Sequence, residues 1–159
     1  MENEPVHALM HGSFVIERRF QAPPETVFEA WADPEAKAQW FIGPESWKLV
    51  ERTLDLRSGG EERLEGLFEN GTRTVYAARF HEIIVGKRLV YVYDMYINDA
   101  RLSVSLASVE FGPDDGGTAM TYTEQAVYLD GKDDTESRRH GVGAHFEKLA
   151  VALQRNVPT

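Results

Sequence analysis

Alternating apolar and polar residues predict β-strands over most of the chain. In the segment 118–128, Met120, Tyr122 and Glu124 alternate with threonines, and this period of two is typical of a strand with one buried face. Six other segments show strand-like patterns, and turn-forming pairs such as Asn70-Gly71 separate several of them. The predicted strands cover residues 13–20, 47–56, 62–68, 72–83, 88–95, 102–111 and 118–128. Short loops between the last six favour an antiparallel arrangement.

Three segments have helical patterns. Ala22-Pro23-Pro24-Glu25 opens the first helix, because proline is tolerated in a first turn and an early acid suits the helix dipole. Asp33 is the predicted N-cap of a short second helix over residues 34–40. The third and longest helix covers residues 137–154, where Val142, Phe146 and Leu149 share one face.

The order of these elements predicts an α+β fold. One strand and two short helices precede about six antiparallel strands and a long C-terminal helix, so a curved sheet of about seven strands would wrap around that helix. In the segment 104–111 the apolar residues change from even to odd positions, which predicts a β-bulge near Ala107-Ser108. Residues 13–155 are expected to form a single domain after a flexible N-terminal tail of residues 1–12.

Composition and charge exclude several classes of function. The 159 residues include 17 basic and 26 acidic side chains, and the formal net charge of −9 argues against nucleic acid or an anionic membrane surface as partner. The chain has no cysteine, so disulfide frameworks and thiolate metal sites are excluded. The acidic N-terminus lacks a signal-peptide pattern and no apolar run reaches membrane-spanning length, so a cytoplasmic protein is expected.

No metal or cofactor site is expected from the sequence. His140 and His145 are five residues apart, which differs from the spacing of three or four that aligns two ligands on one helix face. His145 is therefore expected at the surface or in a hydrogen bond to a cap. Glycine pairs such as Gly59-Gly60 lie in turns and not between a strand and a helix, so they do not form a phosphate-binding motif.

Several motifs resemble those of a known protein family. They occur in the family's order and belong to a likeness over residues 14–153: Phe20-x-Ala22-Pro23-Pro24, Trp40-Phe41, Asp55-Leu56-Arg57, Arg88-Leu89-Val90-Tyr91 and Tyr122-Thr123-Glu124-Gln125. The chain is similar to START-like helix-grip proteins (the SRPBCC superfamily), and more narrowly to the bacterial stand-alone branch of the heat-shock protein 90 ATPase activator homologue-like domain. The resemblance implies a START-like helix-grip domain over residues 13–155 with a hydrophobic-ligand cavity. It does not imply a reaction.

The candidate binding residues combine side chains of the predicted sheet with apolar residues of the helical regions. They are Trp31, Trp40, Phe41, Tyr76, Tyr91, Tyr93, Leu106, Tyr122, Glu124, Val142, Phe146 and Leu149. A small apolar or aromatic molecule is the expected partner, because cavities that bind small molecules are mostly apolar. A homodimer is also compatible with the sequence. Val142 stands where the family's helix often carries threonine or tryptophan, so its side chain is expected to shape the cavity.

Glu124 is the candidate whose charge conflicts with its predicted position on a buried strand face. Such a carboxylate has to be paired, protonated or directed into a cavity. The favoured interpretation is an ion pair with Arg18 or an equivalent buried network. Arg18 shares the inward parity of the first strand and lies on the strand expected beside the last one. A ligand-facing acid or base and a solvent-exposed carboxylate are the alternatives.

Three functions are compatible with these observations. The favoured one is a non-enzymatic module that binds a small molecule in an apolar cavity. The second is an enzyme of the polyketide-cyclase type, in which Glu124 would abstract or deliver a proton, although the sequence offers no convincing second catalytic residue. The third is a co-chaperone that stimulates the heat-shock protein 90 ATPase by surface contact, and it rests on the family's name alone.

Overall fold

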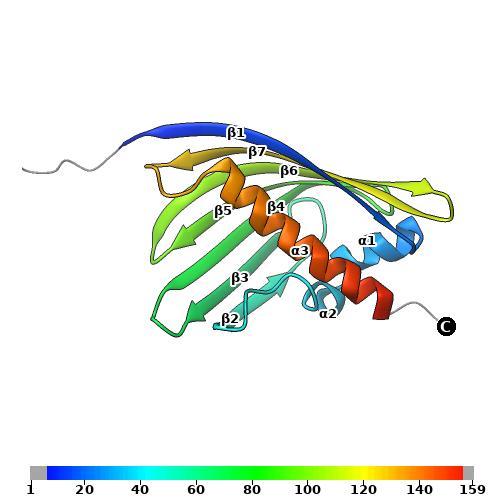
Figure 1. The fold of residues 1–159 in the computed structure, drawn as a ribbon, viewed down its shortest axis with the longest axis horizontal. Coiled ribbons are helices and arrows are strands. Elements are labelled where there is room, and N and C mark those ends of the chain that lie inside the picture. Colours follow the sequence, from blue (N-terminus) through cyan, green and yellow to red (C-terminus); the bar gives the residue numbers. More distant parts are fainter. Residues whose placement is uncertain (1–6, 156–159) are drawn as a thin grey trace, which may run out of the picture.

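A seven-stranded antiparallel sheet curves around one long helix in the computed structural model, which describes residues 7–155 (Figure 1). The strand order is β1-β7-β6-β5-β4-β3-β2. The elements are β1 (Leu9–Phe20), α1 (Pro24–Ala32), α2 (Pro34–Lys37), β2 (Trp47–Leu54), β3 (Glu61–Phe68), β4 (Arg73–Ile84), β5 (Arg88–Ile97), β6 (Ala100–Asp114), β7 (Gly117–Leu129) and α3 (Thr135–Arg155). This arrangement confirms the predicted α+β helix-grip fold.

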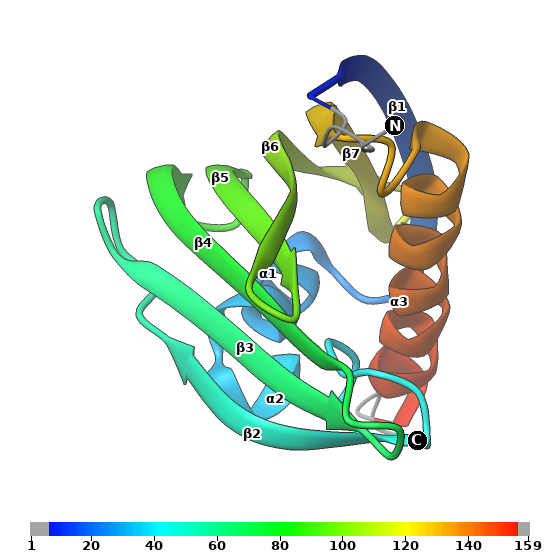
Figure 2. The same cartoon turned by 90° about the vertical axis from the view of Figure 1, so that its left-hand side faces the viewer.

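The helix α3 lies across the concave face of the sheet, and α1 and α2 lie beside its C-terminal half (Figures 1 and 2). Strand β1 pairs with β7 along its whole length, from Leu9 opposite Leu129 to Phe20 opposite Thr118. The first and last strands are therefore neighbours, as the sequence predicted. The sheet, α3 and the two short helices surround a common interior.

The tight turns between the last three strands follow from their residues. Asn98 and Asp99 join β5 to β6 with φ values of 48° and 69°, and Asp115 and Gly116 join β6 to β7 with φ values of 47° and 83°. Two successive positive φ values define a type I′ turn, whose twist matches that of antiparallel strands. Asparagine, aspartate and glycine tolerate this conformation best, so these residues fix the register of the hairpins.

The helix boundaries follow from capping. Asp33 accepts a hydrogen bond from the backbone N–H of Ala36 at 3.0 Å, which confirms it as the N-cap of α2. This helix ends at Lys37 and not at residue 40, because the next turn is tighter: the N–H of Trp40 binds the carbonyl of Lys37. Asp134 accepts a bond from the N–H of Ser137 at 2.9 Å and starts α3 in the same way.

Strand β6 does not contain the bulge that was predicted near Ala107-Ser108. Its odd-numbered residues from 103 to 111 are all buried, so one parity holds along this stretch. The register shift against β5 lies further back, beside Leu102. The prediction was wrong because it treated inward positions as apolar, whereas Ser103 and Ser105 face inward and bind buried charged groups through their hydroxyls.

The N-terminal strand is longer than predicted. It begins at Leu9 and not at residue 13, and its first residues pair with the end of β7, where Leu9 lies opposite Leu129. His11, assigned by the sequence to a tail, therefore belongs to the sheet. The early part of β1 was missed because Leu9, Met10 and His11 are all exposed and show no alternation. Residues 1–6 of the expected tail lie outside the described residues.

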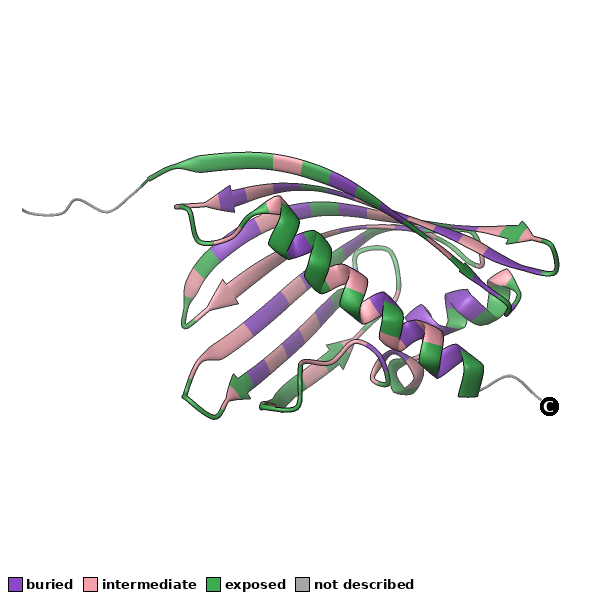
Figure 3. Cartoon of the chain, in the orientation of Figure 1, coloured by how far each residue is buried: buried purple, intermediate pink, exposed green. Residues whose placement is uncertain are grey.

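Buried residues alternate with more exposed ones along most strands, whereas β2 has no buried residue (Figure 3). The core between the layers is rich in aromatic rings. Trp31 packs edge-on against Trp40 at a centroid distance of 4.8 Å, and Phe28 packs edge-on against Phe111 at 5.6 Å. Such edge-to-face pairs are a favourable geometry for aromatic rings. Trp31 and Trp40 also pack against Phe146 of α3, so rings from both short-helix regions join the sheet to the C-terminal helix.

A glycine in β3 makes room for the Trp47 ring of β2. A methyl group at Gly66 would overlap the indole, whose Nε1 donates to the Thr74 hydroxyl at 2.9 Å. We expect Gly66→Ala to lower the free energy of unfolding by about 1–3 kcal/mol, because the ring must leave its hydrogen bond. Urea denaturation followed by circular dichroism measures the change.

Gly112→Ala is the matched control, because a methyl group on this β6 glycine would meet no atom within 4 Å. Its free energy of unfolding should stay within about 0.5 kcal/mol of the wild-type value. Equal stabilities for the two variants would contradict the packing of Trp47 on Gly66.

Candidate functional site

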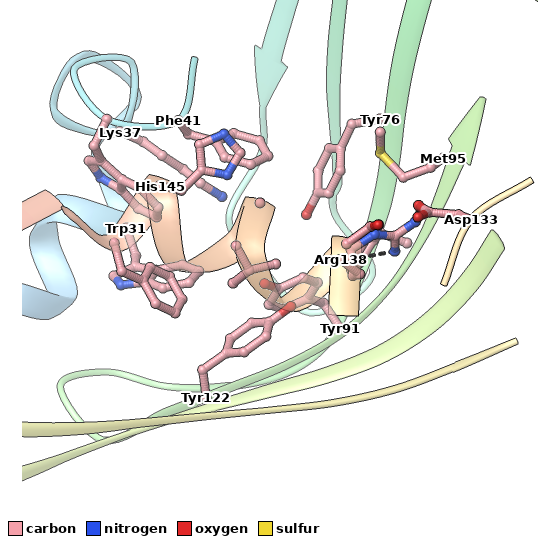
Figure 4. Close-up of a pocket in the computed structure, with 16 residues that line it drawn as sticks. Trp31, Lys37, Phe41, Tyr76, Tyr91, Met95, Tyr122, Asp133, Arg138 and His145 are labelled. Carbon is pink, nitrogen blue, oxygen red and sulfur yellow. Dashed lines mark hydrogen bonds and ion pairs between the residues drawn. The ribbon is translucent and has the colours of Figure 1, made fainter. Parts of the chain in front are cut away.

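A cavity of about 200 Å³ lies between the concave face of the sheet and α3 (Figure 4). Aromatic side chains from α1, the segment after α2, and strands β4, β5 and β7 form most of its wall, and α3 closes it. The lining residues are Trp31, Lys37, Trp40, Phe41, Tyr76, Tyr91, Tyr93, Met95, Tyr122, Asp133, Ser137, Arg138, Gly141, Val142, His145 and Phe146.

Nine of the twelve candidate residues line this cavity. They are Trp31, Trp40, Phe41, Tyr76, Tyr91, Tyr93, Tyr122, Val142 and Phe146. The structure thus places these nine side chains around one space. Whether they bind a ligand stays a prediction.

Three candidates do not line the cavity. Leu106 is 43% exposed on the convex side of β6, which corrects its assignment to the site. The error has the same cause as the misplaced bulge, since the inward positions of this strand carry serines. Leu149 is fully buried in the core, and Glu124 lies behind the wall with 0% exposure.

Glu124 is confirmed as a buried carboxylate, and both of its oxygens accept hydrogen bonds. Tyr93 donates to Oε1 at 2.7 Å, and the Tyr122 hydroxyl donates to the same oxygen. Ser105 donates to Oε2 at 2.8 Å, and the Arg138 guanidinium lies 3.2 Å from it. Four donors satisfy the lone pairs of an ionised carboxylate, so the charge is compensated within the protein.

The sequence suggested Arg18 as the partner of Glu124. In the structure the partner is Arg138 of α3. In the sheet Arg18 lies opposite Met120, which is four residues from Glu124 and therefore about 13 Å along the strand. Arg18 instead approaches Glu147 on α3 at 3.7 Å, and both side chains are partly exposed. Glu124 therefore has a buried arginine partner, but that partner lies on α3 and not on β1.

The Arg138 guanidinium donates to four further groups. Its Nη1 donates to the Tyr93 hydroxyl at 2.9 Å and to the Ser105 hydroxyl at 3.3 Å, and its Nη2 donates to Ser103 at 2.6 Å and to Asp133 at 3.0 Å. Burial lowers the pKa of Arg138, but Tyr93, Glu124 and Asp133 together raise it above the usual value. The guanidinium is thus a fixed positive charge at this end of the cavity.

A second buried ion pair lies at the opposite end, beside α2. Lys37 Nζ is 2.7 Å from Glu62 Oε1, and both side chains are only 4% exposed. The ammonium also lies over the rings of Trp31 and Phe41, at 5.3 and 4.8 Å from their centroids. Burial lowers the pKa of Lys37, and the charge of Glu62 opposes this shift.

His145 is part of the wall next to Lys37. Burial lowers its pKa to about 4, and the charge of Lys148 contributes to the same shift, so the imidazole is neutral at pH 7. Its Nε2 lies 3.2 Å from the carbonyl of Ile42. A carbonyl only accepts, so we assign the hydrogen to Nε2, which leaves Nδ1 as an acceptor.

The tyrosines of the cavity stay protonated. Burial raises the pKa of Tyr76, Tyr91 and Tyr122 well above the ordinary value, and neighbouring buried tyrosines and carboxylates raise it further. Their hydroxyls are therefore neutral hydrogen-bonding groups and do not supply a base at neutral pH.

Several lining residues were not predicted from the sequence. They are Lys37, Met95, Asp133, Ser137, Arg138, Gly141 and His145. The sequence did contain a signal that Arg138 faces the cavity. Arg138, Val142 and Phe146 are spaced four residues apart, and residues at this spacing share a helix face. His145, expected at the surface or a cap, does bind a backbone carbonyl but also faces the cavity.

The part of the chain that the structure describes contains no group of three or more His, Cys, Asp or Glu side chains that could hold a metal ion. Within residues 7–155, none of the helices has the length and apolar character needed to cross a membrane.

The two arginines allow a direct test of the ion-pair assignment. Arg138→Met leaves the Glu124 carboxylate buried without its counter-charge, so we expect the free energy of unfolding to fall by about 3–5 kcal/mol. Arg18→Met removes only a partly exposed pair and should cost less than about 1 kcal/mol. Chemical denaturation of both variants measures the difference, and a larger loss for Arg18→Met would reverse the assignment.

Solved structures of bacterial proteins share this fold. An uncharacterized protein from Rhizobium leguminosarum is 38% identical, with a TM-score of 0.90 over 95% of this chain and 99% of that chain. A Rhizobium loti protein is 34% identical, with a TM-score of 0.85 over 92% and 99% of the two chains. An AHSA1-like protein from Aeromonas hydrophila is 19% identical with a TM-score of 0.70, over 91% and 93%, and shows the fold alone.

A search of curated proteins found no match. Residues 21–154 match the family described as "Activator of Hsp90 ATPase homolog 1-like protein". This match covers most of the chain and agrees with the helix-grip architecture and with the motifs in the sequence. The chain therefore belongs to the Activator of Hsp90 ATPase homolog 1-like family.

Proposed function

We propose that this protein binds a small, mostly apolar molecule with a ring, in the cavity between the sheet and α3. The observation that carries the proposal is the cavity itself: about 200 Å³ of space surrounded by aromatic side chains inside an otherwise packed core. Protein interiors are normally packed as densely as organic crystals, so a space of this size is unusual without a use. Concave, mostly apolar spaces of this kind are typical of small-molecule sites.

The size of the cavity limits the size of the ligand. An engineered cavity of about 150 Å³ lined by apolar side chains binds benzene. A cavity of about 200 Å³ therefore suits one aromatic ring with a short substituent. Larger molecules would require α3 or the segment after α2 to move.

The ring faces of the wall suit an aromatic guest. Tyr122 meets Phe146 edge-on at a centroid distance of 5.3 Å, and Phe41 meets Tyr76 edge-on at 4.8 Å. These pairs hold the rings at angles that leave faces and edges available to a further ring. Burying roughly 200 Å² of apolar ligand surface contributes about 5 kcal/mol. The loss of translational freedom opposes this gain by about 4 kcal/mol or more, so a polar contact is needed for tight binding.

An acid or base role for Glu124 fits this geometry poorly. The carboxylate is fully buried behind the cavity wall, and Tyr93, Tyr122, Ser105 and Arg138 occupy its lone pairs. A general base needs a lone pair within reach of the substrate's proton. The cyclase-type alternative would therefore require this network to open, and we assign Glu124 a structural part.

The description of the family refers to the Hsp90 ATPase, and such an activity requires contact with a protein surface. The buried aromatic residues of this chain line a cavity between the sheet and α3. The ligand-binding proposal follows from that feature, whereas a chaperone contact would rest on the family description alone.

Val142 offers a test, because it is half-buried on α3 and lines the cavity. We expect Val142→Trp to fill much of the space and to weaken binding of n-propylbenzene at least tenfold while the protein stays folded. Titration followed by ¹H–¹⁵N NMR spectra measures both the affinity and the fold.

Val151→Trp is the matched control, since Val151 lies on the same helix with 48% exposure. Its affinity for n-propylbenzene should equal that of the wild type. Unchanged affinity in a folded Val142→Trp variant would place the ligand outside the cavity and contradict the proposal.

A further inference from the structure

Lys37 brings a buried positive charge to the end of the cavity beside α2. Its side chain reaches from the short helix into the cavity, near His145 and Phe41 (Figure 4). The ammonium is 4% exposed and pairs with Glu62 at 2.7 Å. A buried ammonium group is costly unless its charge is paired and its N–H donors form hydrogen bonds. Any donor that has no acceptor in the protein would therefore favour a ligand that supplies one.

An ammonium group has three N–H donors, and the described residues provide an acceptor for one of them. That acceptor is Glu62 Oε1. The other close neighbours of Nζ are the rings of Trp31, Trp40 and Phe41, at 5.3, 5.9 and 4.8 Å. Ring faces stabilise the charge but provide no oxygen lone pair. Two N–H donors of Lys37 are therefore available to a guest in the cavity.

Tyr76 places a second donor at the same end. Its ring lies against Phe41 at a centroid distance of 4.8 Å, and its hydroxyl points into the cavity (Figure 4). The residue is 8% exposed, and within residues 7–155 the structure records no hydrogen bond made by this hydroxyl. The Tyr76 oxygen is not among the buried unpartnered side-chain atoms of the described residues, which are Trp31 Nε1 and Tyr128 Oη. Its hydroxyl is therefore accessible and can donate a hydrogen bond to an acceptor on a ligand.

Two further cations surround this end of the cavity. Arg52 Nη1 donates to the carbonyl of Phe41 at 2.9 Å, and Lys148 Nζ donates to the carbonyl of Ile42 at 3.2 Å. Glu62 balances one of the three positive charges that this region gathers. The local excess of positive charge contrasts with the net charge of −9 for the chain and favours an anionic group on the ligand.

We infer that the ligand is an aromatic carboxylate, whose ring lies among the aromatic residues of the cavity and whose carboxylate accepts hydrogen bonds from Lys37 Nζ and the Tyr76 hydroxyl. This inference rests on the proposed function and specifies the chemical class of the ligand. The binding energy would come from ring burial together with charge-assisted hydrogen bonds, which are stronger than neutral ones.

Three probes with the same skeleton separate the contributions of ring and charge. They are 3-phenylpropionate, its neutral amide 3-phenylpropanamide, and n-propylbenzene, each titrated into the full chain and followed by ¹H–¹⁵N NMR spectra. We expect the carboxylate to bind the wild type at least tenfold more tightly than the amide. The amide keeps the shape and the carbonyl oxygen, so this ratio measures the charge.

The double variant Lys37→Met/Glu62→Met removes the buried pair without leaving one charge alone. It should lose the tenfold preference for the carboxylate and still bind n-propylbenzene. The matched control is Arg88→Met/Glu82→Met, which removes an ion pair of 2.8 Å between half-exposed side chains and should keep the preference. Glu62→Gln keeps Lys37 but removes its counter-charge, which the carboxylate of the ligand can then supply, so this variant should bind the carboxylate at least as tightly as the wild type does.

The outcomes distinguish this inference from the proposed function. If none of the three probes binds the wild type, both proposals fail. If n-propylbenzene binds but the carboxylate gains nothing over the amide, the inference is overturned and the proposed function stands. The inference is also overturned if folded Lys37→Met/Glu62→Met keeps the preference for the carboxylate. Should the double variant not fold, weaker carboxylate binding by folded Glu62→Gln would overturn the inference in its place.

Discussion

The ion pair between Glu124 and Arg138 joins the two layers of the molecule. Glu124 lies on β7 and Arg138 in the first turns of α3, with 3.2 Å between their nearest atoms and almost no exposure of either side chain. A buried charge without its partner is strongly destabilising, so this contact fixes where α3 begins along the sheet. Phe146, about two turns further along, packs against Trp31 and fixes the other half of the helix. The cavity lies in the span between these two attachments.

A buried ion pair lies at each end of the cavity. One end contains Glu124 and Arg138, whose donors and acceptors are used within the protein. The other contains Lys37 and Glu62, where donors remain. Under the proposed function, this asymmetry would orient a guest ring with its polar group towards Lys37.

The sequence predicted the fold well because its information is local. Alternation and turn residues placed all seven strands, and the likeness to a family supplied the arrangement around the long helix. The errors arose where polar residues face inward. Ser103 and Ser105 lie on the buried face of β6, where apolar residues were expected from the sequence. This led to the misplaced bulge and to the wrong assignment of Leu106 to the cavity. Arg18 had the correct parity for Glu124, but parity does not give the position along a neighbouring strand, and no pattern in one sequence reports a partner on a distant helix. Lys37 lies in a four-residue helix, too short for any periodicity.

A crystal structure of the protein soaked with 3-(4-bromophenyl)propionate tests the central claim most directly, because the anomalous signal of bromine locates the ring. Binding as described predicts a bromine peak inside the cavity among the aromatic residues and a carboxylate within hydrogen-bond distance of Lys37 Nζ. Crystals saturated with this compound that show an empty cavity, or a bromine peak only at the protein surface, would contradict a ligand site between the sheet and α3.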